Sequence, residues 1–106
     1  IPKTIILASR NEKIPIYGTG KSIRDWIFVD DHCDAIMDVL LNGKSGESYN
    51  ISAGNEIDNI TIIKKILKLM NKSLDLMEFV DERPGEDYRY SLDSLKIRTE
   101  FSGLSF

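Results

Sequence analysis

Short apolar segments, separated by glycine and proline, constrain this chain more than any other feature of its sequence. Its longest largely apolar runs, TIILA at 4–8 and WIFV at 26–29, are far shorter than the ~20 residues that a membrane-spanning helix needs. Glycines at 18, 20, 43 and 54 close these segments, so each helix or strand has to be short. The pattern indicates a small fold of short elements, and we expect neither a transmembrane helix nor a cleaved secretion signal.

Four stretches have helical features. Pro2 suits a first helical turn, so we expect a helix over 2–11. Asp30 is a suitable N-cap for a helix that ends at Gly43. The clearest helix follows Asn59, and a small helix over 93–100 would be capped by Asp93. The faces expected to be apolar are His32, Ile36, Val39 and Leu40 in the second helix and Ile63, Ile66, Leu67 and Met70 in the third.

Four strands are expected between these helices, over 14–17, 23–29, 48–52 and 76–80. Pro15 has no N–H to donate, which favours an edge position for the first strand. The sequence at 18–20 (GTG) resembles the start of a dinucleotide-binding turn, but no third glycine and no helix follow, so we interpret it as a plain turn. The order of elements predicts an α/β fold.

Length, charge and the single cysteine and histidine exclude several classes of protein. At 106 residues the chain is long enough for one modest core. A net charge of −3 argues against broad binding of nucleic acid. The single Cys33 and single His32 exclude a disulfide framework and a multi-histidine metal site, and we expect a cytoplasmic protein. These two side chains point about 100° apart on a helix, which disfavours a catalytic dyad; we expect His32 to pack or cap and Cys33 to be buried.

Two arginines are the main candidates for binding an anion. Arg24 lies in an apolar segment, where a guanidinium needs a negative partner. That partner is either Asp25 or Asp30 in a structural ion pair or a bound phosphate or carboxylate, and the residues alone favour neither. Arg83 lies on a Pro-Gly turn of the kind that presents binding residues, although a solvated turn is the simpler reading.

An aromatic and an amide side chain complete the set of candidates. Tyr17 offers a stacking face to a base, but a half-buried strand aromatic is the more ordinary interpretation. Asn59 is fully explained as a helix N-cap. A tyrosine, an asparagine and two arginines together describe a nucleoside diphosphate site, which their spacing alone supports only weakly.

Five motifs, in order, resemble one known family. They are IPIYGTG at 14–20, RDWIFVDDH at 24–32, YNISAGNE at 49–56, Asn59 at a helix start, and DERPGEDYRY at 81–90. Over residues 1–98 the chain is similar to the C-terminal half of extended short-chain dehydrogenases that act on nucleotide sugars, most closely to their dTDP-glucose 4,6-dehydratase branch. The resemblance implies an α/β fold, the C-terminal part of an extended Rossmann-type short-chain dehydrogenase, with a small mixed sheet and helices.

The resemblance also implies roles for particular residues. Pro15 and Tyr17 would lie by the base and ribose of a dTDP-sugar, Arg24 and Arg83 would bind its diphosphate, and Asn59 would contact the nucleotide. Residues 1–106 would be the substrate-binding portion, and the chain, which opens at Ile1, is expected to be a piece of a longer polypeptide. NAD and the catalytic residues would belong to a preceding domain, and the full-length protein would form a homodimer. The enzyme would be a lyase of deoxysugar or rhamnose biosynthesis.

One departure from the family pattern keeps alternatives open. Glu86 stands where the family usually has a histidine, and a carboxylate does not donate to a phosphate as that histidine does. We therefore include Glu86 among the substrate-binding candidates while leaving dTDP and UDP both possible. The alternatives are another nucleotide-sugar enzyme, such as a UDP-glucose 4-epimerase or UDP-glucuronate decarboxylase, and a stand-alone non-catalytic domain that binds a nucleotide or a protein partner.

Overall fold

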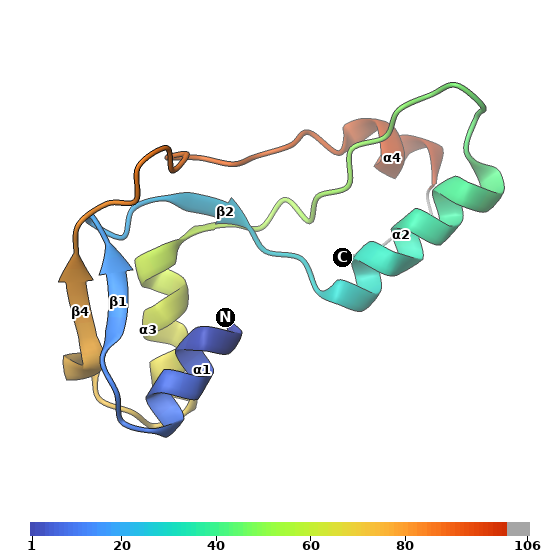
Figure 1. Cartoon of the computed structure of the whole chain (residues 1–106). Coiled ribbons are helices and arrows are strands. Elements are labelled where there is room, and N and C mark those ends of the chain that lie inside the picture. Colours follow the sequence, from blue (N-terminus) through green and yellow to red (C-terminus); the bar gives the residue numbers. More distant parts are fainter. Residues whose placement is uncertain (102–106) are drawn as a thin grey trace. The chain divides into compact units, whose positions relative to one another are not determined.

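The computed structural model describes residues 1–101 and orders them as an α/β chain of short elements (Figure 1). The chain divides into two compact units, one formed by residues 1–24 with 57–89 and the other by 25–56 with the described residues from 90 onward. None of the described helices is both long and apolar enough to span a membrane. The elements are α1 (Pro2–Ser9), β1 (Ile14–Tyr17), β2 (Ile23–Asp25), α2 (Val29–Asn42), β3 (Glu56–Asp58), α3 (Asn59–Leu69), the 3₁₀ turn η1 (Leu74–Leu76), β4 (Met77–Val80) and α4 (Leu95–Glu100).

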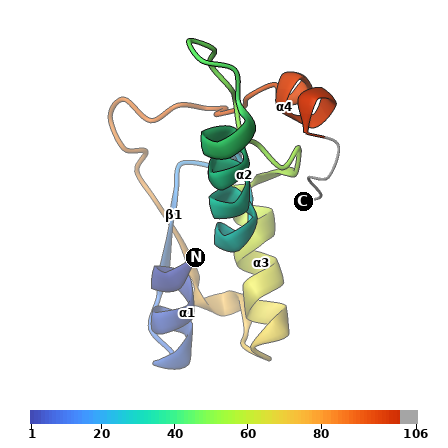
Figure 2. The same cartoon turned by 90° about the vertical axis from the view of Figure 1, so that its right-hand side faces the viewer.

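The first unit is built on a parallel pair of strands. β1 pairs with β4 in a register that runs from Ile14 opposite Met77 to Tyr17 opposite Val80. With two strands in this sheet, Pro15 lies in an edge strand, as predicted. The two views show α1 alongside α3, and α1 also contacts β1 (Figures 1 and 2). The core consists of the buried Ala8, Ile14 and Leu67, with Leu7, Ile63, Met70, Leu76 and Met77 packed around them.

The turn after β1 is tight, and it requires glycine. The Gly20 N–H donates to the Tyr17 carbonyl at 3.1 Å, and Gly18 and Gly20 have φ values of +60° and +72°. A Cβ on Gly20 would lie 2.8 Å from the Ile60 Cβ, so α3 begins directly against this turn. The turn leads into β2 and not into a helix, which confirms that it is not a dinucleotide-binding loop.

Strand β2 brings the loop after β4 next to Arg24. β2 pairs with β3, and the Ile23 N–H donates to the Tyr88 carbonyl at 2.7 Å. An isolated parallel bridge joins Ile23 to Arg89. The predicted strand over 23–29 is wrong beyond Asp25, because the following residues lead into α2, which already begins at Val29.

The caps of two helices differ from those predicted. α3 has Asp58 as its N-cap and not Asn59, and the Asp58 carboxylate accepts the Thr61 N–H at 2.8 Å. α2 has Phe28 as its N-cap and no side-chain cap, so the prediction of Asp30 was wrong. Asp30 and Asp31 instead lie in the first turn, where their charges favour the helix dipole.

The second unit contains α2, α4 and the long connection after α2 (Figure 2). The strand predicted over 48–52 is not formed. Its backbone is bound by α4 side chains: Lys96 Nζ donates to the Ser48 carbonyl at 2.7 Å and Arg98 Nη2 to the Ser52 carbonyl at 2.9 Å. The third strand along the chain is therefore β3, at Glu56–Asp58, and not the predicted 48–52 segment. α4 begins at Leu95, whose N–H is accepted by the Asp93 carboxylate at 2.9 Å.

The surface of α2 is more apolar than its pattern predicted. Ala35 is the fully buried residue of this helix, whereas Ile36 is 48% exposed and Leu40 is 73% exposed. The face expected to be buried is thus largely open, and Cys33, expected to be buried, is exposed.

Candidate functional site

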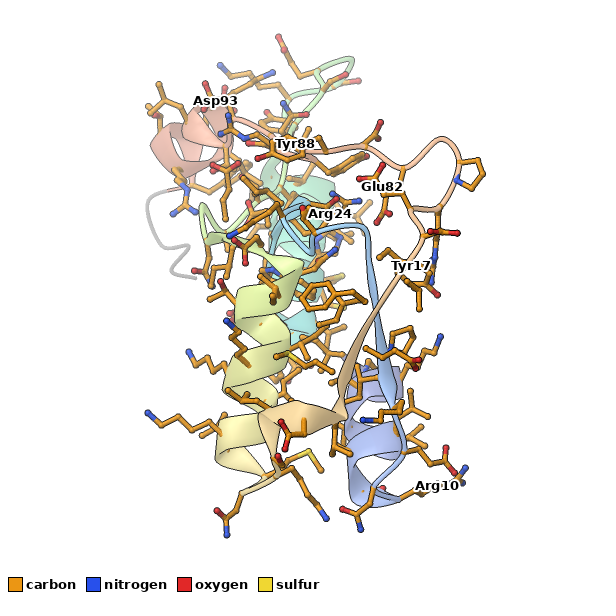
Figure 3. All side chains as sticks on the ribbon, turned by 90° about the vertical axis from the view of Figure 1, so that its left-hand side faces the viewer. Arg10, Tyr17, Arg24, Glu82, Tyr88 and Asp93 are labelled. Carbon is orange, nitrogen blue, oxygen red and sulfur yellow. The ribbon has the colours of Figure 1, made fainter. Side chains whose placement is uncertain are left out.

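All six predicted site residues lie in the first unit. Because β1 and β4 are parallel, their carboxyl ends meet at one edge, and the Gly18 N–H donates to the Val80 carbonyl there at 2.9 Å. The turn after β1 and the 81–88 loop therefore leave the sheet together, at the edge where α/β proteins commonly bind ligands. Figure 3 shows Tyr17, Arg24 and Glu82 toward one end of this unit and Arg10 at the opposite end.

Tyr17 and Arg83 form the first pair of contacting residues. The Arg83 guanidinium carbon lies 3.9 Å from the centre of the Tyr17 ring, a cation–π contact. The Arg83 guanidinium lowers the pKa of Tyr17, with a smaller contribution from Lys3, and Tyr17 in turn raises the pKa of Arg83. No pattern in the sequence indicated that Lys3, in α1, would influence Tyr17.

Arg24 and Glu86 form the second pair. Arg24 Nη1 donates to two backbone carbonyls, Ile23 at 2.8 Å and Asp87 at 3.0 Å, while Nη2 lies 3.5 Å from Glu86 Oε1. An ion pair with Asp25 or Asp30 was one of the two alternatives for Arg24, and the structure shows Glu86 as the ion-pair partner instead. The Asp25 carboxylate instead accepts the N–H groups of Gly54 and Asn55 at 3.1 and 3.0 Å.

Pro15 and Asn59 lie on the same unit but in its regular elements. Pro15 is two residues before Tyr17 in β1, so the two side chains extend from the same face of the strand. Asn59 is the first residue of α3, and its N–H donates to the Ser22 carbonyl at 3.0 Å. The Glu82 side chain has a packing role: it fills the space beside Gly18 and would collide with a Cβ there.

The side chains at this edge are suited to binding an anion. Tyr17 ends β1, Arg24 lies in β2, and Arg83 and Glu86 lie on the loop after β4. Within residues 1–101 no cluster of three or more His, Cys, Asp or Glu side chains could hold a metal ion. NAD does not fit the described residues either, since their Gly18–Gly20 turn opens onto β2 and lacks the helix N-terminus that binds a dinucleotide pyrophosphate.

The fold is that of the C-terminal part of an extended short-chain dehydrogenase of the Rossmann type, as its structural neighbours show. Within that class, the chain belongs to the GDP-mannose 4,6 dehydratase family, which it matches over residues 1–102. A dTDP-glucose 4,6-dehydratase from Streptomyces niveus is 47% identical over 89 residues, or 84% of this chain and 26% of its own length.

Two solved structures show the same similarity in three dimensions. A dTDP-glucose 4,6-dehydratase from Streptomyces venezuelae, solved with NAD bound, is 36% identical with a TM-score of 0.91, over 94% of this chain and 31% of that one. A UDP-glucuronic acid 4-epimerase from Bacillus cereus, in complex with UDP-glucuronic acid and NAD, is 25% identical with a TM-score of 0.87, over 97% of this chain and 33% of that one. The chain thus spans about a third of the length of these relatives.

Proposed function

We propose that this chain is the substrate-binding portion of a dTDP-glucose 4,6-dehydratase, a lyase that converts dTDP-glucose into dTDP-4-keto-6-deoxyglucose. The observation that carries the proposal is the convergence of Tyr17, Arg24 and Arg83 at the carboxyl edge of the β1–β4 pair. The identity of 36–47% to relatives with that name supports it.

Each side chain has a role that its chemistry suits. Arg24 and Arg83 would bind the diphosphate, because guanidiniums donate to phosphate oxygens in a fixed planar geometry. Tyr17 and Pro15 would lie by the base and ribose, where a flat apolar surface supports a planar ring. Asn59 would contact the nucleotide as a neutral donor and acceptor. Glu86 belongs to this site through its contact with Arg24.

The remaining parts of the reaction would lie elsewhere in the polypeptide. NAD, which oxidises the sugar and later returns the hydride, would be bound by an N-terminal domain that also supplies the catalytic residues. Residues 1–106 alone would then be inactive. The complete protein would act in the cytoplasm, in deoxysugar or rhamnose biosynthesis, and would form a homodimer.

The proposal is tested on the complete polypeptide that contains this chain, by calorimetric titration with dTDP and with UDP. We expect dTDP to bind more tightly, and incubation with dTDP-glucose to yield the 4-keto-6-deoxy product. The alternative is a UDP-sugar enzyme, which the similarity to the Bacillus cereus epimerase supports. Tighter binding of UDP, with turnover of UDP-glucose and none of dTDP-glucose, would replace the first assignment with the second.

A further inference from the structure

The Arg24 guanidinium is held by backbone on one side and by a carboxylate on the other. Its Nη1 donates to the carbonyls of Ile23 and Asp87, which come from β2 and from the loop after β4. These two bonds fix the plane of the guanidinium without using any acidic side chain. The Nη2 group is then directed to Glu86 Oε1 at 3.5 Å. An incoming anion would use the same Nη2 group.

Glu86 also acts on the second arginine of the site. The pKa of Arg83 is raised first by its contact with Tyr17 and, beyond that, by the negative charge of Glu86. Glu86 therefore contacts Arg24 directly and also favours the charged form of Arg83. A carboxylate and a phosphate both present oxygens to guanidinium donors, so they compete for the same positions.

The contact between Glu86 and Arg24 is weak enough to be displaced. At 3.5 Å it is longer than the 2.7–2.9 Å typical of charge-assisted hydrogen bonds. The two side chains are 22% and 28% exposed, so water screens the pair. Glu86 follows Gly85, which has φ of +76° and open space at its Cβ position, so the turn has room to move.

We propose that Glu86 occupies the anion position at Arg24 when no ligand is bound, and that a nucleoside diphosphate must displace it in order to bind. Glu86 is then a residue that sets affinity by competition, and it does not itself hold the ligand. The identity of the anion rests on the proposed function, whereas the competition for Arg24 does not.

The test compares Glu86→Gln with the wild type in the complete polypeptide, by calorimetric titration with dTDP and separately with inorganic pyrophosphate. Glutamine keeps the shape of the side chain and removes the charge. We expect both ligands to bind about threefold to tenfold more tightly, since the half-buried ion pair no longer has to be broken and no negative charge opposes the ligand. Glu86→Ala gives the same direction if the glutamine variant folds poorly.

Two controls separate displacement from a general change of charge. Glu82→Gln removes one charge from the same loop, at a side chain that lies by Gly18, and should change both affinities less than twofold. In an Arg24→Ala background, Glu86→Gln should bring a clearly smaller gain, because only the charge interaction of Glu86 with Arg83 remains. Unchanged or weaker binding of both ligands in Glu86→Gln, or the same gain without Arg24, would overturn the proposal.

The two ligands distinguish this inference from the proposed function. Tighter binding of pyrophosphate in Glu86→Gln, with no binding of dTDP to any variant, supports the competition and contradicts the nucleotide assignment. Binding of dTDP that depends on Arg24 but is not improved by Glu86→Gln supports the assignment and overturns the competition. Failure of both ligands to bind the wild type and Glu86→Gln contradicts both.

Discussion

At the scale of single residues, the backbone bonds that orient Arg24 make it the most consequential side chain of the site. Replacement of Arg24 by alanine in the complete polypeptide should weaken dTDP binding by about 2–4 kcal/mol, because it removes the charge-assisted contact that we propose to the diphosphate. The change is measured as the calorimetric Kd and as the KM for dTDP-glucose.

The matched control for this variant is Arg10→Ala. Arg10 is exposed and lies at the end of the first unit opposite to Arg24 (Figure 3). It has the same charge, so its loss tests whether net charge alone affects binding. An unchanged KM in Arg24→Ala would mean that Arg24 serves only the ion pair with Glu86 and the two carbonyls.

The contact between Tyr17 and Arg83 predicts how the pKa of Tyr17 changes when Arg83 is replaced. The Arg83 guanidinium lowers the pKa of Tyr17, because a positive charge beside the ring favours the phenolate. Arg83→Gln should therefore raise the pKa of Tyr17 toward its ordinary value of about 10. The titration is followed by NMR of ¹³Cζ-labelled tyrosine, with Tyr17→Phe used to assign the resonance. Lys3→Gln should raise the same pKa less, and a pKa of Tyr17 that does not respond to Arg83→Gln contradicts the contact.

The partner of Arg24 illustrates what residue-level reasoning predicts and what it misses. Because Trp26 and Phe28 are apolar neighbours, the Arg24 guanidinium was expected to need an anionic partner. The structure provides that partner. The sequence suggested the nearby Asp25 or Asp30, whereas the partner is Glu86, far along the chain. Such a pairing depends on β1 and β4 being adjacent and parallel, which local patterns do not encode.

At the scale of elements, α3 was predicted well because its apolar residues repeat at the helical period. Its cap was misplaced by one residue, since aspartate and asparagine both suit that position.

Asp58→Ala should lower the free energy of unfolding by about 1 kcal/mol through loss of the bond to the Thr61 N–H. Asn59→Ala should cost less than about 0.5 kcal/mol. Chemical denaturation measures both, and the reverse ranking would restore Asn59 as the cap.

The stability that the Asp58 cap contributes to the folded state depends on pH, and the pKa shift of Asp58 sets the direction. Bonds from Thr61 lower the pKa of Asp58, so the carboxylate is favoured in the folded state. This contribution is fully present above the unfolded pKa of about 4 and is lost as the pH falls through the lower folded value. The difference in stability between the wild type and Asp58→Ala should accordingly shrink below about pH 4.

The strand predicted over 48–52 shows where element-level patterns fail. Tyr49 and Ile51 alternate with polar residues, which is typical of a strand. A strand also needs a neighbour to accept and donate its hydrogen bonds, and here side chains of Lys96 and Arg98 bind the carbonyls instead. The competing partners lie more than 40 positions away in the chain, beyond the reach of a periodicity argument.

At the scale of the whole molecule, the open surface of α2 predicts how the 106-residue chain behaves when it is isolated. Large apolar side chains on this helix are exposed, among them Leu40 at 73% and Leu41 at 71%. Monomeric proteins seldom expose contiguous apolar patches of this kind. We therefore expect the isolated chain to self-associate at micromolar concentrations, as measured by sedimentation velocity.

The double variant Leu40→Asn/Leu41→Asn should shift the isolated chain toward a monomer, because it removes two of the most exposed side chains from α2. Leu69→Asn is the matched control: Leu69, in α3 of the first unit, is 78% exposed but lies outside α2. If association depended on exposed leucine in general, this control would reduce it in proportion. Association equal in the double variant and the parent, or a parent that sediments as a monomer, contradicts the role of α2.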